Sequence, residues 1–318
     1  QYYFKDLGES KGHTWCSEKI LKAAISNNLY ECCNKVDWLL ENNDFLHIDN
    51  GRIGLKYYYD IEMQIYHLIL NKSQIETTIN ISNEAIDKAI KHAEEEQGFD
   101  YVVEQLDTIH KSLHRTVSLI TGKAGTGKTS IMRAIVKAYM ENNYMMTASA
   151  LSAMAAQRIT EATEFHAMTI HRTLGCQGLT DFTYNKDNHL ITDVAFLDEG
   201  SMVNASLFLH WLEAIGDNTR IIISGDHKQL PPIGFGNVFS DLIEMFDESV
   251  VSKLVKPMRQ AEKSGILVDA NKIRENINPI SEKLQPRIIH GELQDMYYMF
   301  RTNRQSLFNI AVKTFIKS

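Results

Sequence analysis

Long apolar runs are absent from this sequence of 318 residues, and none approaches the roughly 18 consecutive apolar residues that a membrane-spanning helix needs. We therefore expect no contact with a membrane. No signal-peptide pattern precedes the first charged residues, which predicts a protein that is not exported.

Cysteine is scarce, which excludes a fold stapled by disulfides. The four cysteines, Cys16, Cys32, Cys33 and Cys176, show neither C-x-x-C spacing nor the pattern of a disulfide framework. Cys32 and Cys33 lie in a helical pattern, where packing as small apolar side chains is favoured over metal binding. This usage is typical of a reducing compartment and predicts a cytoplasmic protein.

An excess of positive charge is also lacking. The formal net charge is −7, which argues against indiscriminate binding of nucleic acid. The charge is uneven, however: residues 111–172 hold eight Lys and Arg against three Glu, a local charge of +5 that leaves −12 for the remainder. Such a basic segment can hold a phosphate backbone locally. Alternatively, part of this charge serves only a bound nucleotide.

The strongest motif that is present lies at 122–129. It matches G-x-x-x-x-G-K-[ST] in full, with Gly122, Gly127, Lys128 and Thr129 at the required spacing. An apolar run of strand type, 117–120, precedes it, and a helical pattern follows. This order of strand, loop and helix predicts a phosphate-binding loop rather than a chance glycine-rich turn.

The chemistry of such a loop is specific for a nucleoside triphosphate with Mg²⁺. Glycines let backbone N–H groups turn inward around the phosphates, and the following helix adds the positive end of its dipole. Lys128 would neutralise the β- and γ-phosphate oxygens, and the Thr129 hydroxyl would ligate Mg²⁺. The residues predicted to bind ATP here are Gly122, Lys123, Ala124, Gly125, Thr126, Gly127, Lys128, Thr129 and Ser130.

A second apolar strand, 194–197, ends in two acids, Asp198 and Glu199. Two adjacent acids alone mean little. At the end of a buried strand downstream of a phosphate loop, they predict that Asp198 holds Mg²⁺ opposite Thr129 and that Glu199 deprotonates the attacking water.

A third apolar strand, 220–225, runs into a polar loop that contains Gln229. An amide can bond both a phosphate oxygen and the attacking water, so we expect Gln229 to sense the γ-phosphate. Arg259 is a candidate for the stabilisation of transition-state charge, as an arginine finger. Upstream, Gln105 has the donor and acceptor that suit the adenine edge, although a surface glutamine would be the default at this spacing.

Residues 14–58 read as two helices followed by a hairpin whose turn is Asp49-Asn50-Gly51. This pattern is winged-helix-like. Such units contact duplex DNA or act as protein–protein wedges, and the acidic second helix (Glu31, Asp37 and Glu41 against Lys35) weighs against DNA. Protein partners through this region are therefore expected as an alternative. Segments 182–185 and 189–192 flank Lys186-Asp187-Asn188 and predict a second, small hairpin.

Taken together, these stretches resemble superfamily 1 helicases of the RecD/TraA type. The matching stretches, in the order and spacing of that family, are 122–129, 147–158, 169–175, 198–202, 225–231 and 259–260. The resemblance covers about residues 99–276. Gly200 departs from it, because the family usually carries Ala there.

The resemblance implies an ATP-driven motor that moves 5′ to 3′ on single-stranded DNA and separates duplex at junctions, in DNA repair and recombination. It assigns Lys128, Glu199, Gln229 and Arg259 to catalysis and Gln105 to adenine. Thr147, Thr169, His171 and Arg172 resemble residues that contact the DNA strand. The hairpin at about 176–192 resembles a strand-separating pin.

The predicted fold is α/β, with a RecA-like P-loop domain built on a parallel sheet. We expect a winged-helix-like and helical region over 1–98, the motor domain over 99–276, and the start of an incomplete second RecA-like domain over 277–318, where 303–317 reads as a helix. A fragment of this kind would bind ATP but not unwind DNA alone. The alternative is a regulatory, nucleic-acid-binding P-loop ATPase that does not translocate.

Overall fold

The computed structural model describes residues 2–28, 36–178, 181–258, 263–280 and 287–299. The chain divides into two compact units. One comprises residues 1–122 and 128–254, and the other comprises 123–127 and 255–318.

The first unit is built on a six-stranded sheet of order β6-β5-β7-β8-β4-β9, in which every pair is parallel. Its strands are β4 (Val117–Gly122), β5 (Met146–Ala150), β6 (Ala167–Thr169), β7 (Val194–Asp198), β8 (Arg220–Gly225) and β9 (Val251–Leu254). Every residue of β4 and β8 is buried, as expected when helices cover both faces of a parallel sheet. The predicted RecA-like α/β sheet is confirmed.

Alternate residues of the central strands enter two separate cores. In β8, Ile221 and Ile223 pack in one core, whereas Ile222 packs in the other. In β7, Leu197 and Phe196 divide in the same way. This alternation follows from the period of two in a strand, and it fixes which helices lie on which face.

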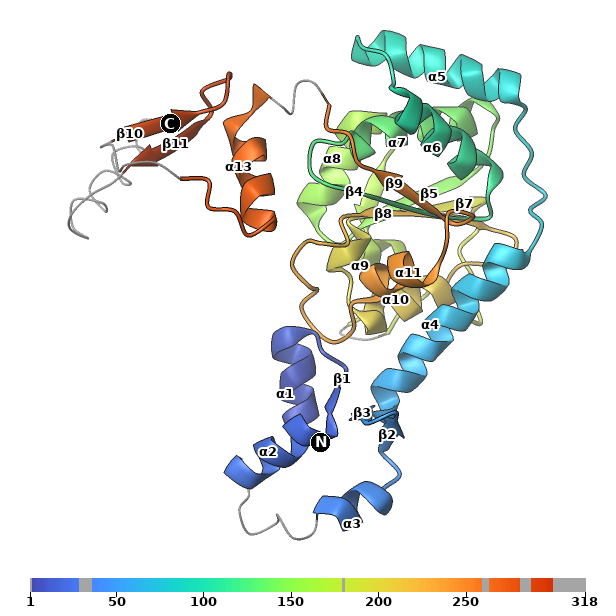
Figure 1. Cartoon of the computed structure of the whole chain (residues 1–318). Coiled ribbons are helices and arrows are strands. Elements are labelled where there is room, and N and C mark those ends of the chain that lie inside the picture. Colours follow the sequence, from blue (N-terminus) through green and yellow to red (C-terminus); the bar gives the residue numbers. More distant parts are fainter. Residues whose placement is uncertain (1, 29–35, 179–180, 259–262, 281–286, 300–318) are drawn as a thin grey trace. The chain divides into compact units, whose positions relative to one another are not determined.

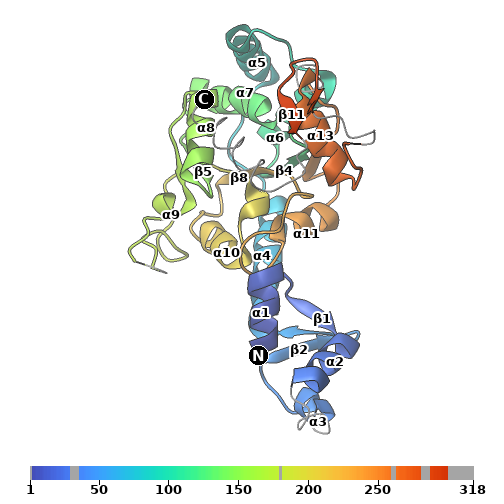
Figure 2. The ribbon, with the colours of Figure 1, turned by 90° about the vertical axis from the view of Figure 1, so that its left-hand side faces the viewer.

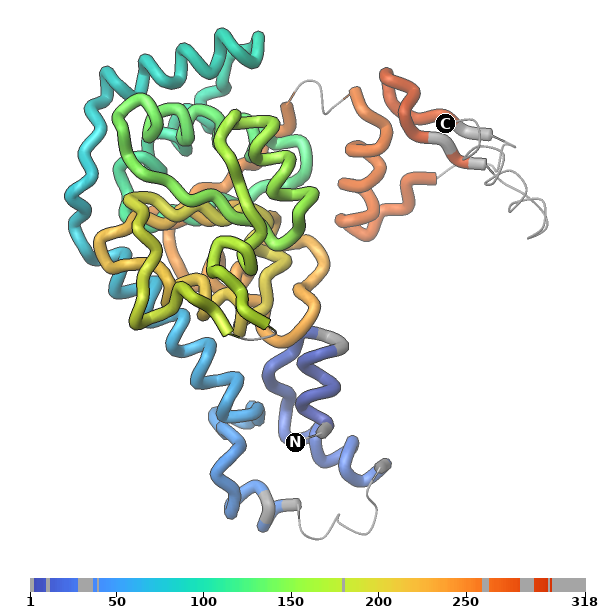
Figure 3. The backbone as a smooth tube through the Cα atoms, turned by 180° about the vertical axis from the view of Figure 1, so that it is seen from behind, coloured from blue at the N-terminus to red at the C-terminus, as the bar shows by residue number. Residues whose placement is uncertain are grey.

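Helices cover both faces, as Figure 1 shows. One face carries α5 (Asn83–Gln97), α6 (Val103–His114), α7 (Lys128–Glu141) and α8 (Ala153–Thr163). The other carries α4 (Lys56–Gln74), the short α9 (Ile170–Thr173), α10 (Ala205–Glu213) and α11 (Val238–Met245). The segment between α4 and α5, cyan in Figure 3, crosses from one face to the other.

The N-terminal region contains α1 (Tyr2–Lys11), β1 (Trp15–Ser17), α2 (Glu18–Asn28), α3 (Val36–Glu41), β2 (Leu46–Asp49) and β3 (Arg52–Leu55). The three strands form an antiparallel sheet of order β1-β3-β2. The hairpin turn lies where the sequence predicts it, because Asn50 and Gly51 adopt positive φ angles of 47° and 74°. Cys32 and Cys33, with their predicted packing, lie outside the described residues.

Helix α4 joins this region to the large sheet (Figures 1 and 2). Its residues Ile61, Ile65 and Ile69, spaced four apart, pack in the core beneath the sheet. At its C-terminal end the buried Lys72 donates hydrogen bonds of 2.7, 3.0 and 3.2 Å to the carbonyls of Gly216, Asp217 and Thr219. The helix is therefore held to the core by its isoleucines and to the segment between α10 and β8 by Lys72.

Glu62 on α4 and Asp241 on α11 are two acids whose charges interact; Glu62 is partly buried, and Asp241 is exposed. Partial burial, opposed by a hydrogen bond from Thr14 and assisted by the charge of Asp241, raises the pKa of Glu62 to about 7. Desolvation by the surrounding residues, and then the charge of Glu244, raise the pKa of Asp241 to about 6, although its side chain keeps contact with solvent. Both groups hold their protons more tightly in the folded protein than in an unfolded chain.

The free energy of unfolding should therefore fall as the pH rises from about 4 to about 7, since over that window the folded state binds more protons than the unfolded state. We expect Glu62→Gln to be more stable than the wild type by about 1 to 2 kcal/mol at pH 8, and equal to it near pH 4. Urea unfolding followed by circular dichroism measures both, with the exposed Glu95→Gln as control. Parallel pH profiles for the wild type and Glu62→Gln would contradict this.

The second unit contains α13 (Gly265–Arg274) and the antiparallel pair β10 (Arg287–His290) and β11 (Met296–Met299). Asp295 accepts hydrogen bonds from the Ser264 hydroxyl and the Gly265 amide, at 2.6 and 2.7 Å, and so caps α13. Asp269 bonds His290 at 2.6 Å and fixes the hairpin to the helix. The helix predicted over 303–317 lies outside the described residues. Among the described helices, none has the length and apolarity to cross a bilayer.

Candidate nucleotide and nucleic-acid site

The predicted phosphate loop joins β4, which ends at Gly122, to α7, which begins at Lys128. Gly125 and Gly127 have φ angles of 83° and 86°, a region that side chains other than glycine rarely adopt. Between them, the hydroxyl of Thr126 donates to the Lys123 carbonyl at 2.8 Å. Gly127 is a glycine that the motif requires, whereas Gly125 is a second glycine whose backbone conformation only the structure shows.

Lys128 is half-buried, and its ammonium donates to the Gly122 carbonyl at 2.7 Å. This bond directs the ammonium to the end of β4, where the phosphate loop begins. Thr129 follows it with an exposed side chain in the first turn of α7, as a metal-ligating hydroxyl requires.

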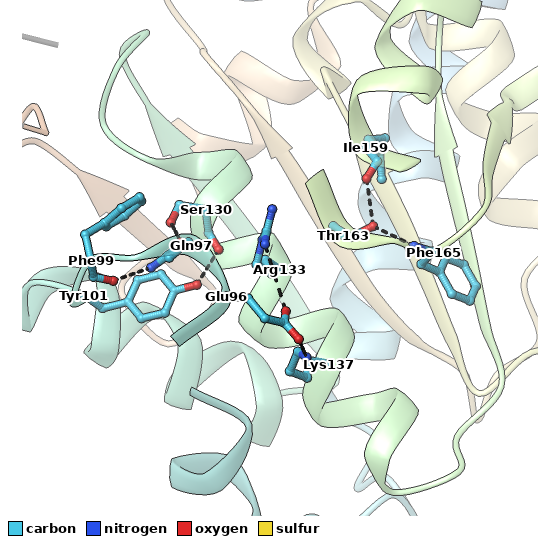
Figure 4. Close-up of polar contacts among 10 residues, drawn as sticks. All are labelled: Glu96, Gln97, Phe99, Tyr101, Ser130, Arg133, Lys137, Ile159, Thr163 and Phe165. Atoms are coloured by element: carbon cyan, nitrogen blue, oxygen red, sulfur yellow. Dashed lines mark hydrogen bonds and ion pairs between the residues drawn. The ribbon is translucent and has the colours of Figure 1, made fainter. Parts of the chain in front are cut away.

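Ser130 has a role in packing that the motif did not predict. Its hydroxyl donates to Gln97 at 2.6 Å, and its carbonyl accepts a hydrogen bond of 2.7 Å from the Tyr101 hydroxyl (Figure 4). Gln97 in turn donates to the Phe99 carbonyl at 2.9 Å. These bonds fasten the end of α5 to the first turn of α7, so the Ser130 hydroxyl contributes to the position of the helix that carries the phosphate loop.

The two predicted acids lie at the C-terminal end of β7. Asp198 accepts a hydrogen bond from the Ser224 hydroxyl, and burial raises the pKa of Asp198. Burial, and then the charge of Asp198, raise the pKa of Glu199. Lys128 lowers the pKa of both carboxyls. The ammonium and the two acids therefore occupy one electrostatic neighbourhood, as a shared magnesium nucleotide requires.

Glu199 has two unusual features. Its backbone is left-handed, with φ 54°, which costs a non-glycine residue on the order of 1 kcal/mol. Its Oε2 is buried, and no described residue hydrogen-bonds to it. A buried carboxylate oxygen without a partner, beside a second buried acid, fits a site that takes a cation and a water. Among the described residues, no group of three or more His, Cys, Asp or Glu could hold a metal ion.

Asp226 and Arg158 are two further charged residues near Glu199 that the sequence motifs did not single out. Asp226 is 3% exposed, accepts a hydrogen bond from the Lys228 amide at 3.1 Å, and raises the pKa of Glu199, so its charge lies close to the predicted base. Its signal was an acid directly after the buried strand β8, close to the strand end as Asp198 is on β7. Arg158, exposed on α8, lowers the pKa of Glu199 and carried no comparable signal.

The loop after β8 is docked against the end of β4. His227 Nδ1 lies 2.7 Å from the Thr121 hydroxyl, which places the loop beside the strand that leads into the phosphate loop. The backbone N–H of Gln229 donates to the backbone carbonyl of Asp226 at 3.0 Å, whereas the side chain of Gln229 is exposed. The role of Gln229 as a phosphate sensor stays a prediction.

Gln105 lies in the first turn of α6 and is 2% exposed. Its Oε1 accepts a hydrogen bond of 3.1 Å from the Val102 amide, so at least this oxygen caps the helix. The side chain is therefore not the surface glutamine that would be the default, and adenine recognition stays a prediction. Arg259 lies outside the described residues.

The residues predicted to contact DNA lie on β5 and at β6 and α9. Thr147 lies in β5, and Thr169 caps α9 by accepting from the Arg172 amide at 3.3 Å. His171 and Arg172 are exposed on that helix. The cap determines how these two side chains are presented, which gives Thr169 a structural role in addition to the predicted contact.

The expected small hairpin is reduced to a tight turn. Asn185 and Asn188 exchange both backbone hydrogen bonds, at 3.0 and 3.2 Å, around two residues. Beyond the turn, Leu190 pairs with Ile215 instead of returning along 182–185. The described part of 176–192 therefore contains a turn without two paired strands. Its role as a strand-separating pin stays a prediction.

A fully parallel sheet, a phosphate loop between β4 and α7, and acids at the end of β7 define a P-loop nucleoside triphosphatase with a RecA-like fold. A family model described as an AAA domain matches residues 100–294, more than half of the chain. The chain belongs to this family.

Among curated proteins, the chain is 29% identical over 199 residues to the RecBCD enzyme subunit RecD of Mycobacterium tuberculosis, an alignment that covers 54% of this chain and 34% of that one. It is 33% identical over 184 residues to the ATP-dependent RecD2 DNA helicase of Deinococcus radiodurans, covering 58% and 24%. These relatives confirm the resemblance to RecD-like superfamily 1 proteins. The chain thus spans about a third or less of the length of either relative.

Among solved structures, the chain is similar to the Pif1 helicase of Candida albicans, with a TM-score of 0.43 and 24% identity over 57% of this chain and 45% of that one.

Proposed function

We propose that this chain is the ATP-hydrolysing motor domain of a RecD-like DNA helicase, which moves 5′ to 3′ on single-stranded DNA and separates duplex at junctions. The observation that carries the proposal is the common electrostatic neighbourhood of Lys128, Asp198 and Glu199. The similarity to RecD and RecD2 supports DNA as the track. The unpaired thiols of Cys16 and Cys176 agree with action in the cytoplasm.

In this mechanism, Lys128 binds the β- and γ-phosphates, and Asp198 and Thr129 would hold Mg²⁺. A bound Mg²⁺ would offset the negative charge that gathers on the phosphates. Glu199 takes the proton of the attacking water through its buried oxygen. Gln229 contacts the γ-phosphate, Gln105 contacts adenine, and Arg259 stabilises the transition state. The exposed His171 and Arg172, together with Thr147 and Thr169, hold the DNA strand through its backbone.

The N-terminal region, with its small sheet and helices α1 to α3, is proposed to bind a protein partner. Its one described cation–π contact, Arg52 over Trp15 at 4.4 Å, holds an arginine against the region's own strand β1. An arginine held in this way is less available to a phosphate backbone.

The test is the rate of ATP hydrolysis by this chain with and without a single-stranded thymidine oligonucleotide. We expect stimulation by DNA in the wild type. Lys128→Ala should weaken nucleotide binding by about 10- to 150-fold, since it removes a charged hydrogen-bond donor to phosphate. A fluorescent ATP analogue measures that binding.

Lys137→Ala is the matched control, because Lys137 lies on the same helix but forms an ion pair with Glu96 at the surface (Figure 4). It should bind nucleotide as the wild type does. An ATPase rate that single-stranded DNA leaves unchanged would contradict the proposal and favour a regulatory ATPase. Equal losses in both variants would assign the Lys128 effect to folding instead.

A further inference from the structure

A tight turn, residues 226–229, follows β8 and ends at Gln229. The backbone N–H of Gln229 donates to the Asp226 carbonyl at 3.0 Å, the bond that closes a β-turn. The backbone N–H of Lys228 donates to the Asp226 carboxylate at 3.1 Å, so the same aspartate also supports the turn with its side chain. The backbone that carries the Gln229 side chain is therefore held in one conformation by two local hydrogen bonds.

One residue of this turn bonds the strand that leads into the phosphate loop. His227 Nδ1 lies 2.7 Å from the Thr121 hydroxyl oxygen, and the backbone N–H of His227 donates to that oxygen at 3.4 Å. Thr121 pairs with Gly225 across β4 and β8, and Gly122, the first residue of the phosphate-loop motif, follows it. A single hydroxyl thus connects the turn to the chain one residue before that motif.

The hydroxyl of Thr121 is not needed by its own strand. Thr121 is 1% exposed, and β4 pairs with β8 and β9 through backbone groups, for which a β-branched valine would serve as well. A buried hydroxyl without a partner would be costly, and the partners that the structure gives this one both belong to His227. The contact is therefore a specific connection between the strand and the turn.

The beginning of the turn also lies against the segment that carries Glu199. A Cβ on Gly225 would lie 3.1 Å from the backbone nitrogen of Ser201, in the short 3₁₀ helix Gly200–Met202 that follows Glu199 directly. The negative charge of Asp226 acts on Glu199 as well. The turn is thus in contact with the segment of the predicted base as well as with the strand that leads into the phosphate loop.

We propose that Thr121 and His227 are positioning residues for ATP hydrolysis, whose hydrogen bond sets the place of Gln229 relative to the phosphate loop. The inference rests on the proposed function, because it concerns how the group that contacts the γ-phosphate is held. The bond fixes the turn, and the rate of hydrolysis depends on the turn. The affinity for the nucleotide comes from the phosphate loop and does not depend on this bond.

The test compares Thr121→Val with Thr121→Ser, because valine removes the hydroxyl and serine retains it. Single-turnover hydrolysis of ATP without DNA measures the rate, and a fluorescent ATP analogue measures the affinity. Thr121→Val should hydrolyse ATP about 2- to 12-fold more slowly, the contribution of one hydrogen bond, and should bind the analogue as the wild type does. Thr121→Ser should keep the wild-type rate. A wild-type rate in Thr121→Val would overturn the proposal.

His227→Phe tests the other partner, because it keeps an aromatic ring and removes the ring nitrogen. It should slow hydrolysis by a similar factor. The double variant Thr121→Val/His227→Phe should be about as slow as the slower single variant, since both substitutions remove the same bond. Losses that multiply in the double variant would mean that the two residues act separately, which contradicts the proposal.

Thr116→Val is the matched control. Thr116 directly precedes β4, is 8% exposed, and donates to the Ile75 carbonyl at 2.7 Å, so the same substitution removes a buried hydrogen bond at the other end of the strand. It should lower the free energy of unfolding in urea as Thr121→Val does, and it should leave the rate of hydrolysis unchanged.

Two results would assign the effect to the packing of β4 and overturn the positioning role: an equal loss of rate in Thr116→Val, or a Thr121→Ser chain as slow as Thr121→Val. A wild-type rate that DNA leaves unchanged would contradict the proposed motor but not this inference, because the variants are compared without DNA. A wild-type chain that does not hydrolyse ATP overturns both proposals.

Discussion

Replacement of Glu199 by glutamine is expected to slow ATP hydrolysis by about 10²- to 10⁴-fold, the usual contribution of a positioned general base. Nucleotide binding should stay close to that of the wild type, because Lys128 and the phosphate loop are unchanged. The reason lies in the geometry of the carboxylate: its Oε2 is buried and no described residue bonds it, so it is available to a water. Glutamine keeps the shape and loses the basic oxygen.

The pH dependence of hydrolysis should report the same group. Burial and the charge of Asp198 raise the pKa of Glu199 above its ordinary value of 4.5, and Lys128 acts against them. A base works only when it is deprotonated, so the rate should fall as the pH drops through that raised pKa. The acidic limb of the profile for the wild type should therefore lie above pH 4.5 and should be absent from the residual activity of Glu199→Gln.

Single-turnover hydrolysis measures the loss of rate in Glu199→Gln, and the binding of a fluorescent ATP analogue measures any loss of nucleotide affinity. Glu161→Gln serves as the control, since Glu161 is an exposed acid on α8. Unchanged hydrolysis in Glu199→Gln would remove Glu199 from the mechanism. A loss of nucleotide binding equal to the loss of rate would make it a ligand-binding group instead of a base.

Much of the site is predictable from the sequence because its parts are local. The phosphate loop needs only a strand, two glycines with positive φ and a helix, all within 117–141, and these are contiguous. The hairpin turn at Asn50-Gly51 is local in the same sense. The order of strands in the sheet could not be derived from any one motif, but apolar strands that end in acids imply a parallel sheet whose C-terminal edge gathers charge.

What the sequence does not show depends on packing between distant segments. Gly200 looks interchangeable with alanine, yet a Cβ there would lie 2.6 Å from Ile223 Cγ2. The side chain that would have to shift belongs to β8, 23 residues further along the chain. Ser130 is similar: the motif assigns it to the nucleotide, but the hydroxyl bonds Gln97 from a helix 33 residues earlier. Such contacts depend on tertiary structure, and the spacing of residues in the sequence does not predict them.

Arg220 is a further example of a residue whose role only the structure reveals, and it gives the second large effect. It begins β8, is 2% exposed, and donates hydrogen bonds to the Leu113 and Ile79 carbonyls and, at 3.3 Å, to the Tyr139 hydroxyl. The guanidinium thus joins α6, the segment before α5, and α7 across one face of the sheet. Such a group satisfies several buried acceptors at once.

Arg220→Met should lower the free energy of unfolding by about 3 to 5 kcal/mol, because two buried carbonyls and a hydroxyl lose charged donors and no water can replace them. The same substitution at Arg133, which lies 4.0 Å from Glu96 in a partly exposed ion pair (Figure 4), should cost about 1 kcal/mol or less. Urea unfolding of both variants measures the two losses of stability. Because each variant replaces Arg by Met, the comparison isolates the effect of the guanidinium's surroundings. If the two losses were equal, the guanidinium of Arg220 would contribute no more than a surface charge, and the helices over this face would have to be held by their apolar contacts alone.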